Sequence, residues 1–148
     1  MLTVFFDGAC EPRNPGGTAS YGFIIFDGDR EIYRESKIVC SGDGASNNVA
    51  EYNGLINALR WLYANKLAER DICCKGDSKL VIEQMNGNWK MNKGIYLPWA
   101  QKCQQALKYF PKIKLEWVSR DFNIADEVSK QRLRDAGIQF KIQPESKP

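Results

Sequence analysis

Short apolar segments alternate with polar, glycine-bearing stretches along this chain, and the apolar spacing changes from two residues to three or four. Residues 2–6 alternate as a short strand that ends at Asp7, and 21–26 and 31–40 form two further predicted strands. The turn 27–30 between them is typical of a hairpin. The early part of the chain is therefore predicted to be antiparallel.

A helical spacing begins after the polar loop 41–48. Apolar side chains then recur every three or four residues, at Val49, Tyr52, Ile56, Leu59 and Tyr63. This spacing predicts a helix over 49–66 with one buried face. The rest of the pattern predicts strands at 71–76 and 112–118, an irregular stretch at 87–97, and helices at 78–85, 98–110 and 123–136.

The order of these elements is β-β-β-α-β-α-α-β-α. The long helix between the first strand and the strand at 71–76 is a crossover, which favours a parallel pair. The prediction is an α/β fold with a five-stranded mixed sheet flanked by helices. We expect one domain over 1–148, in which the alternating tail 138–148 forms an edge strand or a packed arm.

The 148 residues include no histidine. This absence excludes Ser-His-Asp and Cys-His catalysis, histidine-ligated zinc or haem, and an imidazole general base. The net charge is +3, and the excess of positive charge lies wholly after residue 107. Such a bias fits contact with a phosphate backbone without establishing it. Chemistry at neutral pH is left to carboxylates, lysine, tyrosine, cysteine, backbone groups or a bound metal.

The five cysteines are odd in number and lack the C-x-x-C spacing of a zinc site. We interpret them as reduced thiols of a cytoplasmic protein. The segment before Asp7 is too short for a signal peptide, and no apolar run approaches the ~20 residues of a membrane span. The sequence therefore predicts no contact with a membrane.

Four acidic residues, Asp7, Glu51, Asp77 and Asp126, each lie at the boundary of a predicted element. Each also has a purely structural interpretation. Asp7 could belong to a turn, and Asp77 could cap a helix. Glu51 and Asp126 each follow an asparagine by three residues, at Asn48 and Asn123, as in a capping box.

The four carboxylates together favour a different interpretation. Strand ends in an α/β sheet converge on one edge, where functional sites usually form. Clustered carboxylates raise one another's pKa, and a hard divalent cation such as Mg²⁺ offsets that cost without histidine. Two such ions about 4 Å apart can clamp the attacking and leaving oxygens of a phosphoryl transfer. The sequence thus predicts a metal-dependent site.

Several motifs occur in order along most of the chain. They are Asp7-Gly-Ala-Cys10, Asn14-Pro-Gly-Gly17, Asn47-Asn-Val-Ala-Glu51, Gly76-Asp-Ser78, and Trp117-Val118 followed by Asn123-Ile-Ala-Asp126. The ordered set resembles the type 1 ribonuclease H family, and its archaeal and some bacterial members in particular. The resemblance implies a ribonuclease H-like fold.

The resemblance also implies an activity, which is endonucleolytic hydrolysis of the RNA strand of an RNA/DNA hybrid. Asp7, Glu51, Asp77 and Asp126 would hold two Mg²⁺ ions, with Mn²⁺ as a substitute. Water would attack the phosphate in line and leave 3′-hydroxyl and 5′-phosphate ends. Double-stranded RNA is a further candidate substrate, and a monomer is expected.

The family match places Cys10, Asn14, Asn47 and Asn48 along the minor groove of the hybrid, where the 2′-hydroxyl distinguishes RNA from DNA. Helix capping by Asn47 and Asn48 is compatible with this role. For Cys10, a small residue in a turn whose backbone makes the contact is an equal alternative.

The chain departs from many family members at two positions. Lys79 stands where relatives often have glutamine, and is either a phosphate contact or a solvated helix residue. The loop before Asp126 lacks the histidine that many members carry, and Arg120 is its nearest replacement. Arginine stays protonated, so our hypothesis is a role in phosphate binding or product release.

Two alternatives remain open on the same fold. The chain could be a non-catalytic nucleic-acid-binding module, or a DNA-cutting nuclease of the wider superfamily. All four acidic residues are present, which argues against the first. The Asn14-Pro-Gly-Gly17 and Asn47-Asn48 motifs argue against the second.

Overall fold

The computed structural model describes residues 1–140. Its strands are β1 (Leu2–Glu11), β2 (Thr18–Asp27), β3 (Arg30–Ser41), β4 (Ile72–Gly76) and β5 (Ile113–Trp117). Its helices are α1 (Asn47–Ala64), α2 (Lys79–Met85), α3 (Leu97–Leu107) and α4 (Ala125–Asp135), with single 3-10 turns at Gly42–Gly44 and Arg120–Phe122. The order of elements matches the one that the apolar spacing predicts.

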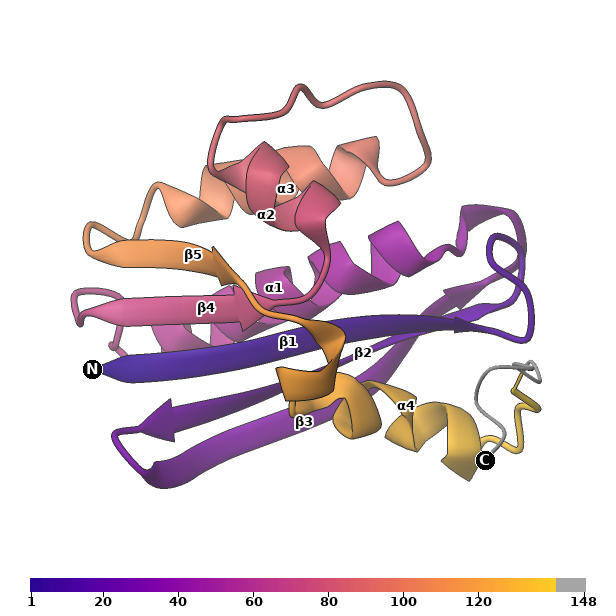
Figure 1. Cartoon of the computed structure of the whole chain (residues 1–148), viewed down its shortest axis with the longest axis horizontal. Coiled ribbons are helices and arrows are strands. Elements are labelled where there is room, and N and C mark those ends of the chain that lie inside the picture. The colour runs from indigo at the N-terminus through magenta and orange to yellow at the C-terminus, as the bar shows by residue number, and fades with distance from the viewer. Residues whose placement is uncertain (141–148) are drawn as a thin grey trace.

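The five strands form one mixed sheet in the order β3-β2-β1-β4-β5 (Figure 1). β1 pairs antiparallel with β2, and β2 with β3, whereas β1 pairs parallel with β4 and β4 with β5. The predicted five-stranded mixed sheet is confirmed. The carboxyl ends of β1, β4 and β5 consequently point to the same edge of the sheet.

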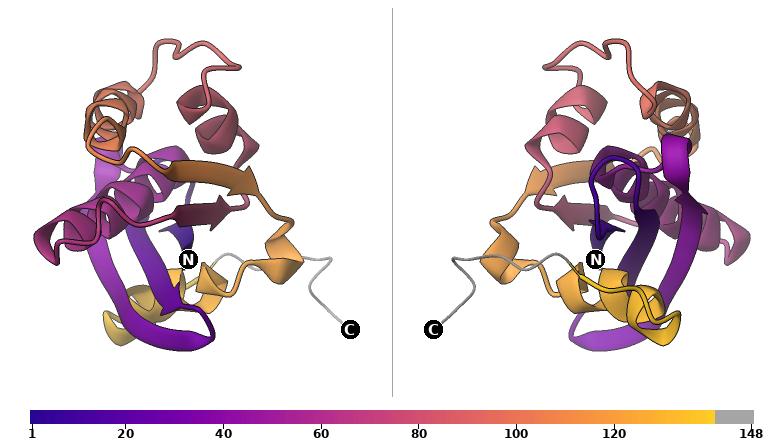
Figure 2. Two further views of the ribbon diagram at one scale, coloured as in Figure 1. Left: turned by 90° about the vertical axis from the view of Figure 1, so that its left-hand side faces the viewer. Right: turned by 90° about the vertical axis from the view of Figure 1, so that its right-hand side faces the viewer.

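Helices cover both faces of the sheet. Tyr21, Phe23 and Ile25 of β2 join the main core with α1, while Gly22 between them contacts α4 on the opposite face. Figure 2 shows α2 and α3 at one end of the molecule and α4 at the other. No helix within residues 1–140 combines the length and the apolar character that crossing a membrane requires.

The long helix α1 begins two residues earlier than predicted. Its N-cap is Ser46, whose Oγ accepts a hydrogen bond from the Val49 amide, so the predicted cap at Asn48 is wrong. Four of the five periodic side chains are buried, but Tyr63 is 58% exposed. Tyr63 lies in the last turn and packs against Tyr109 rather than against the sheet.

The helix α4 ends as its sequence predicts. Gly137 adopts a left-handed φ of 74°, and the Ile138 amide donates to the Leu133 carbonyl. Residues 138–140 form no strand, so the predicted edge strand is absent from the described part of the tail. The remainder of the tail, 141–148, lies outside the described residues.

All five cysteines are free thiols. Cys40 is half-buried and the other four are buried, and the adjacent pair Cys73 and Cys74 lies on β4 as predicted. The expectation of unpaired, mostly buried thiols is therefore confirmed.

The close packing of α4 on the sheet depends on Gly22. A Cβ atom at this position would lie 2.4 Å from the backbone nitrogen of Ser129, which cannot move without shifting the helix. We expect Gly22→Ala to lower the free energy of unfolding by roughly 1–3 kcal/mol, the usual cost of overpacking. Urea unfolding measures this loss. Gly44→Ala is the control, because a Cβ atom there meets no other atom within 4 Å, and an equal loss in both variants would contradict the packing argument.

Candidate active site

Asp7 lies inside β1 rather than at its end, which corrects the sequence prediction. The parallel pairing of β1 with β4 stops at Phe5 opposite Lys75, but the antiparallel pairing with β2 continues to Glu11. Asp7 is therefore held by one neighbouring strand just beyond the end of the other. Its side chain is only 3% exposed, and its Oδ1 accepts a hydrogen bond from the Gly8 amide at 2.9 Å.

Glu51 reaches the same place from α1 because helix and strand approach unusually closely. A Cβ atom at Gly8 would lie 2.4 Å from the Glu51 nitrogen, so only glycine permits this packing. Glu51 lies in the second turn of α1, not the first, and is 6% exposed. Its Oε2 is buried without a hydrogen-bond partner.

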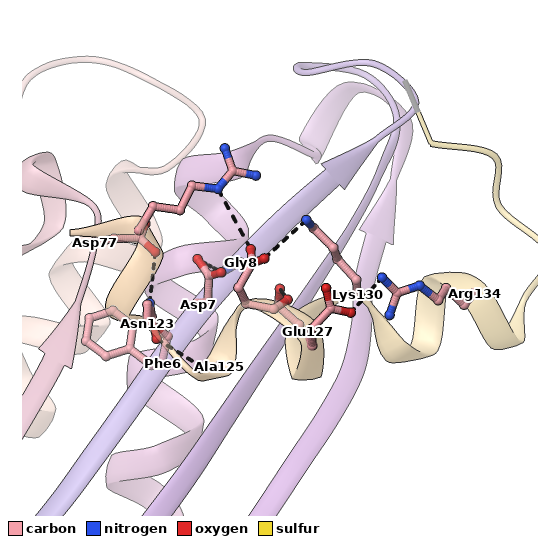
Figure 3. Close-up of polar contacts among 12 residues, drawn as sticks. Phe6, Asp7, Gly8, Asp77, Asn123, Ala125, Glu127, Lys130 and Arg134 are labelled. Carbon is pink, nitrogen blue, oxygen red and sulfur yellow. Dashed lines mark hydrogen bonds and ion pairs between the residues drawn. The ribbon is translucent and has the colours of Figure 1, made fainter. Parts of the chain in front are cut away.

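Asp77 follows the last residue of β4. It does not cap α2, since that cap is Ser78, whose Oγ accepts from the Val81 amide. The Asp77 backbone carbonyl accepts a hydrogen bond from Trp117 Nε1 at 3.0 Å, and its Oδ2 accepts one from Asn123 Nδ2 at 2.9 Å (Figure 3). Both backbone and side chain of Asp77 are thus fixed by residues that follow β4 in the chain.

Three carboxylates form a compact group. One oxygen from each of Asp7, Glu51 and Asp77 lies within 4.8 Å of the others. Asp126, in the first turn of α4 as predicted, lines the same cavity but is not in this group. It is instead flanked by Lys130, whose Nζ is 3.4 Å from Oδ2, and by Arg120, whose Nε is 3.9 Å from Oδ1.

Burial is the main cause that raises the pKa of each of the three carboxyls. Burial raises the pKa of Asp7 to about 7; a hydrogen bond from Glu51 partly opposes this rise, and the charge of Asp77 adds to it. Burial and the adjacent Asp7 raise the pKa of Glu51 well above its usual value. The pKa of Asp77 is also raised by burial, against the hydrogen bond from Asn123.

This arrangement fits a divalent cation. Mg²⁺ and Mn²⁺ prefer carboxylate oxygens, and a cation would offset the mutual repulsion of three partly buried acids. The unpartnered Oε2 of Glu51 is a ready ligand in a cavity of about 350 Å³. The residues that line this cavity are Asp7, Gly8, Ala9, Cys10, Glu11, Pro12, Asn14, Asn47, Glu51, Asp77, Arg120, Asp126 and Lys130.

The predicted substrate-contacting residues divide into two sets. Cys10, Asn14, Asn47 and Arg120 line the cavity, whereas Asn48 and Lys79 are not among its lining residues. Asn14 Oδ1 accepts a hydrogen bond from the Asn47 amide at 2.9 Å, which joins the loop after β1 to the start of α1.

The side chains of Cys10 and Lys79 have partners of their own within the chain. The Cys10 thiol donates to the Arg13 carbonyl, and burial raises the pKa of that thiol. This favours the alternative in which the backbone of Cys10 faces the cavity. Lys79 is exposed, with its Nζ 5.1 Å from the centre of the Trp117 ring.

Sequence reasoning missed the positions of Asn123 and Lys130. The Asn123 side chain donates to the Phe6 carbonyl and to Asp77, and its Oδ1 accepts from the Ala125 amide at the start of α4. The sequence motif indicated only a cap there. Lys130 follows Asp126 by four residues, the spacing of an ion pair on one helix face, and that spacing could have identified it.

The family model described as reverse transcriptase-like matches residues 5–131. A bifunctional protein of Mycobacterium tuberculosis is 38% identical over 129 residues, which are 86% of this chain and 34% of that protein. The chain thus spans about a third of the length of the first curated relatives that it matches. Ribonuclease HI of Halobacterium salinarum is 34% identical over 137 residues, 90% of this chain and 64% of that protein.

Solved structures give the same result. The crystal structure of ribonuclease H1 from Halobacterium salinarum superimposes with a TM-score of 0.79 at 29% identity, covering 90% of this chain and 98% of that one. The structure of LC11 ribonuclease H1 in complex with an RNA/DNA hybrid gives a TM-score of 0.80 at 26% identity, covering 92% and 99%. By the extent of the matching family model, its ribonuclease HI relative and these structures, the chain belongs to the type 1 ribonuclease H family.

Proposed function

We propose that this chain is an endoribonuclease that hydrolyses the RNA strand of RNA/DNA hybrids with the help of divalent cations. The observation that carries the proposal is the group of three carboxylates in a cavity, with one oxygen of Glu51 lacking any partner. The related ribonuclease HI and the hybrid-bound LC11 enzyme support the choice of substrate.

The metal ligands in this proposal are Asp7, Glu51 and Asp77, with Asp126 at the edge of the cavity. We propose two Mg²⁺ ions, for which Mn²⁺ can substitute. Bound ions would activate water and stabilise the leaving oxygen of an in-line displacement, giving 3′-hydroxyl and 5′-phosphate ends. The chain itself contributes fixed carboxylate positions, since hydrogen bonds hold Asp7 and Asp77 from separate elements.

Substrate contacts in this proposal lie beside the carboxylates. The linked pair Asn14 and Asn47 and the backbone at Cys10 are suited to the 2′-hydroxyls and base edges of a minor groove. Asn48, next to Asn47 in the first turn of α1, extends this set. Lys79, whose ammonium lies over Trp117, provides a phosphate contact outside the cavity.

We further propose that residues 1–148 form a single ribonuclease H domain that acts as a cytoplasmic monomer. The main core and a small second cluster, both packed against Val39 and Cys40, support the single domain, and five free thiols support a reducing compartment. The proposal includes double-stranded RNA as a second substrate.

The first prediction from this proposal concerns the dependence of cleavage on substrate and metal. With Mg²⁺ or Mn²⁺, the chain should cleave the RNA strand of a labelled hybrid, and chelation should abolish cleavage. Asp77→Asn should lower kcat at least roughly a hundredfold, because it removes a charged metal ligand. The asparagine keeps the shape of the side chain and an oxygen that can accept the hydrogen bond from Asn123. Asp121→Asn, an exposed acid near the site, is the matched control.

Three results would contradict this prediction. Cleavage that survives chelation, or that Asp77→Asn carries out at the wild-type rate, would remove the metal proposal. Cutting of double-stranded DNA in preference to hybrid would favour a DNA-cutting nuclease. Hybrid binding without cleavage would favour a non-catalytic module.

The second prediction concerns pH in the absence of metal. Between pH about 4 and 7 folded Asp7 keeps a proton that the unfolded chain has lost, because its pKa rises from 3.8 to about 7 on folding. The free energy of unfolding in chelator should therefore fall as pH rises through this interval. From pH 5 to 8 the wild type should lose roughly 2–3 kcal/mol more than Asp7→Asn, at about 1.4 kcal/mol per pKa unit.

Urea unfolding in chelator at both pH values measures this difference. Added Mg²⁺ should restore wild-type stability at pH 8, because a bound cation stabilises the ionised carboxylates. Equal pH dependence in the wild type and Asp7→Asn would show that Asp7 is not the titrating group.

The third prediction concerns Arg120. Its guanidinium lines the cavity near Asp126 and is 73% exposed, so it is free to contact a phosphate. We expect Arg120→Ala to raise KM or lower kcat by roughly threefold to tenfold, the loss of one charged phosphate contact, with partial recovery in Arg120→Lys. Steady-state kinetics on the hybrid measure both constants, and unchanged values in Arg120→Ala would remove the role.

A further inference from the structure

Lys130 is in an unusual position for a surface lysine. It extends from the second turn of α4 into the cavity that holds the carboxylates, and Figure 3 shows its side chain there with the ion pair marked. Its side chain is 17% exposed and that of Asp126 is 27% exposed. Each of the other ion pairs described within residues 1–140 includes a side chain that is at least 43% exposed. The pair of Lys130 with Asp126 is therefore the most buried one in the described chain.

Burial of an ammonium costs free energy unless a partner compensates it. The spacing of four residues on one helix fixes Lys130 beside Asp126, with the acid on the N-terminal side, which is the favourable order. Arg120 approaches the other oxygen of Asp126 from a longer distance and from an exposed side chain that can turn away. Lys130 is thus the cation that α4 itself places beside Asp126.

The cavity consequently has two unequal halves. Asp7, Glu51 and Asp77 form a compact anionic group. Asp126 lies beside Asp7 and Asp77, but both of its oxygens also face cations of the chain. A divalent ion that uses Asp126 as a ligand must compete with Lys130 for that carboxylate. We propose that Lys130 is a positioning residue that holds Asp126 in the cavity and weakens the binding of divalent cations there.

This inference rests on the metal site of the proposed function, and it is tested without nucleic acid. The probe is Mn²⁺ alone, added to the full chain, and the readouts are titration calorimetry and the Mn²⁺ concentration at half of the full shift in Tm. The shift in Tm of each variant is measured from the Tm of that variant in chelator, so a general change in stability cancels.

Lys130→Met should bind Mn²⁺ roughly threefold to tenfold more tightly than the wild type, as expected for the loss of one competing, partly screened charge. Lys130→Arg keeps the charge and should retain wild-type binding. Arg134→Met removes the same charge one turn later on α4, where Arg134 pairs with Glu127 at 2.7 Å, and should also leave Mn²⁺ binding unchanged. In an Asp126→Asn background, Lys130→Met should have a smaller effect, because its ion-pair partner is gone and only its weaker influence on Asp77 remains.

The outcomes separate the two levels of the proposal. A wild-type chain that binds no Mn²⁺ would overturn the metal site and this inference together. Wild-type binding with an unchanged Lys130→Met would overturn this inference alone. Equal effects in Lys130→Met and Arg134→Met, or an undiminished effect of Lys130→Met in Asp126→Asn, would show a general charge effect and would also overturn it.

Discussion

The close approach of β1 and α1 at Gly8 is the constraint on which the site depends. With no side chain at that position, the backbone of Glu51 packs directly on the strand, and the Glu51 carboxyl is buried beside Asp7. Water cannot screen acids in such a place, so the fold carries an electrostatic cost in its interior. The remaining features of the site lie around these buried acids. They include the hydrogen bonds to Asp77 and the cations beside Asp126.

Asp126, unlike the other three acids, forms ion pairs with cations of the chain, and its location explains this difference. It lies on a helix at the edge of the cavity, where cations of the chain can reach it, whereas Asp7 and Glu51 are more deeply buried. The site thus has buried acids that attract cations, and an acid at its edge that already pairs with cations of the chain. This asymmetry follows from the order of elements, because α4 is packed on the sheet from the face opposite to α1.

Apolar spacing, together with turn and cap signals, predicted the order of the strands and α-helices of the described chain but not its two 3-10 turns. The predictions were wrong where contacts with residues distant in the sequence determine the local structure. β1 continues past Asp7 because β2 pairs with it, and α1 is capped by Ser46 rather than Asn48 because the preceding loop positions that hydroxyl. The four acids could be identified as a candidate set, but their unequal grouping depends on packing between elements, which no local pattern encodes.

The Asn123 side chain donates to the Phe6 carbonyl and to the Asp77 carboxylate, which lie 117 and 46 residues before it in the chain. Its Oδ1 also accepts a hydrogen bond from the Ala125 amide, at the start of the helix that carries Asp126. During synthesis, the first three acids emerge from the ribosome long before this amide does. The nascent chain therefore cannot hold the Asp77 carboxylate through this amide until α4 has docked, so completion of the described fold and readiness of the site coincide.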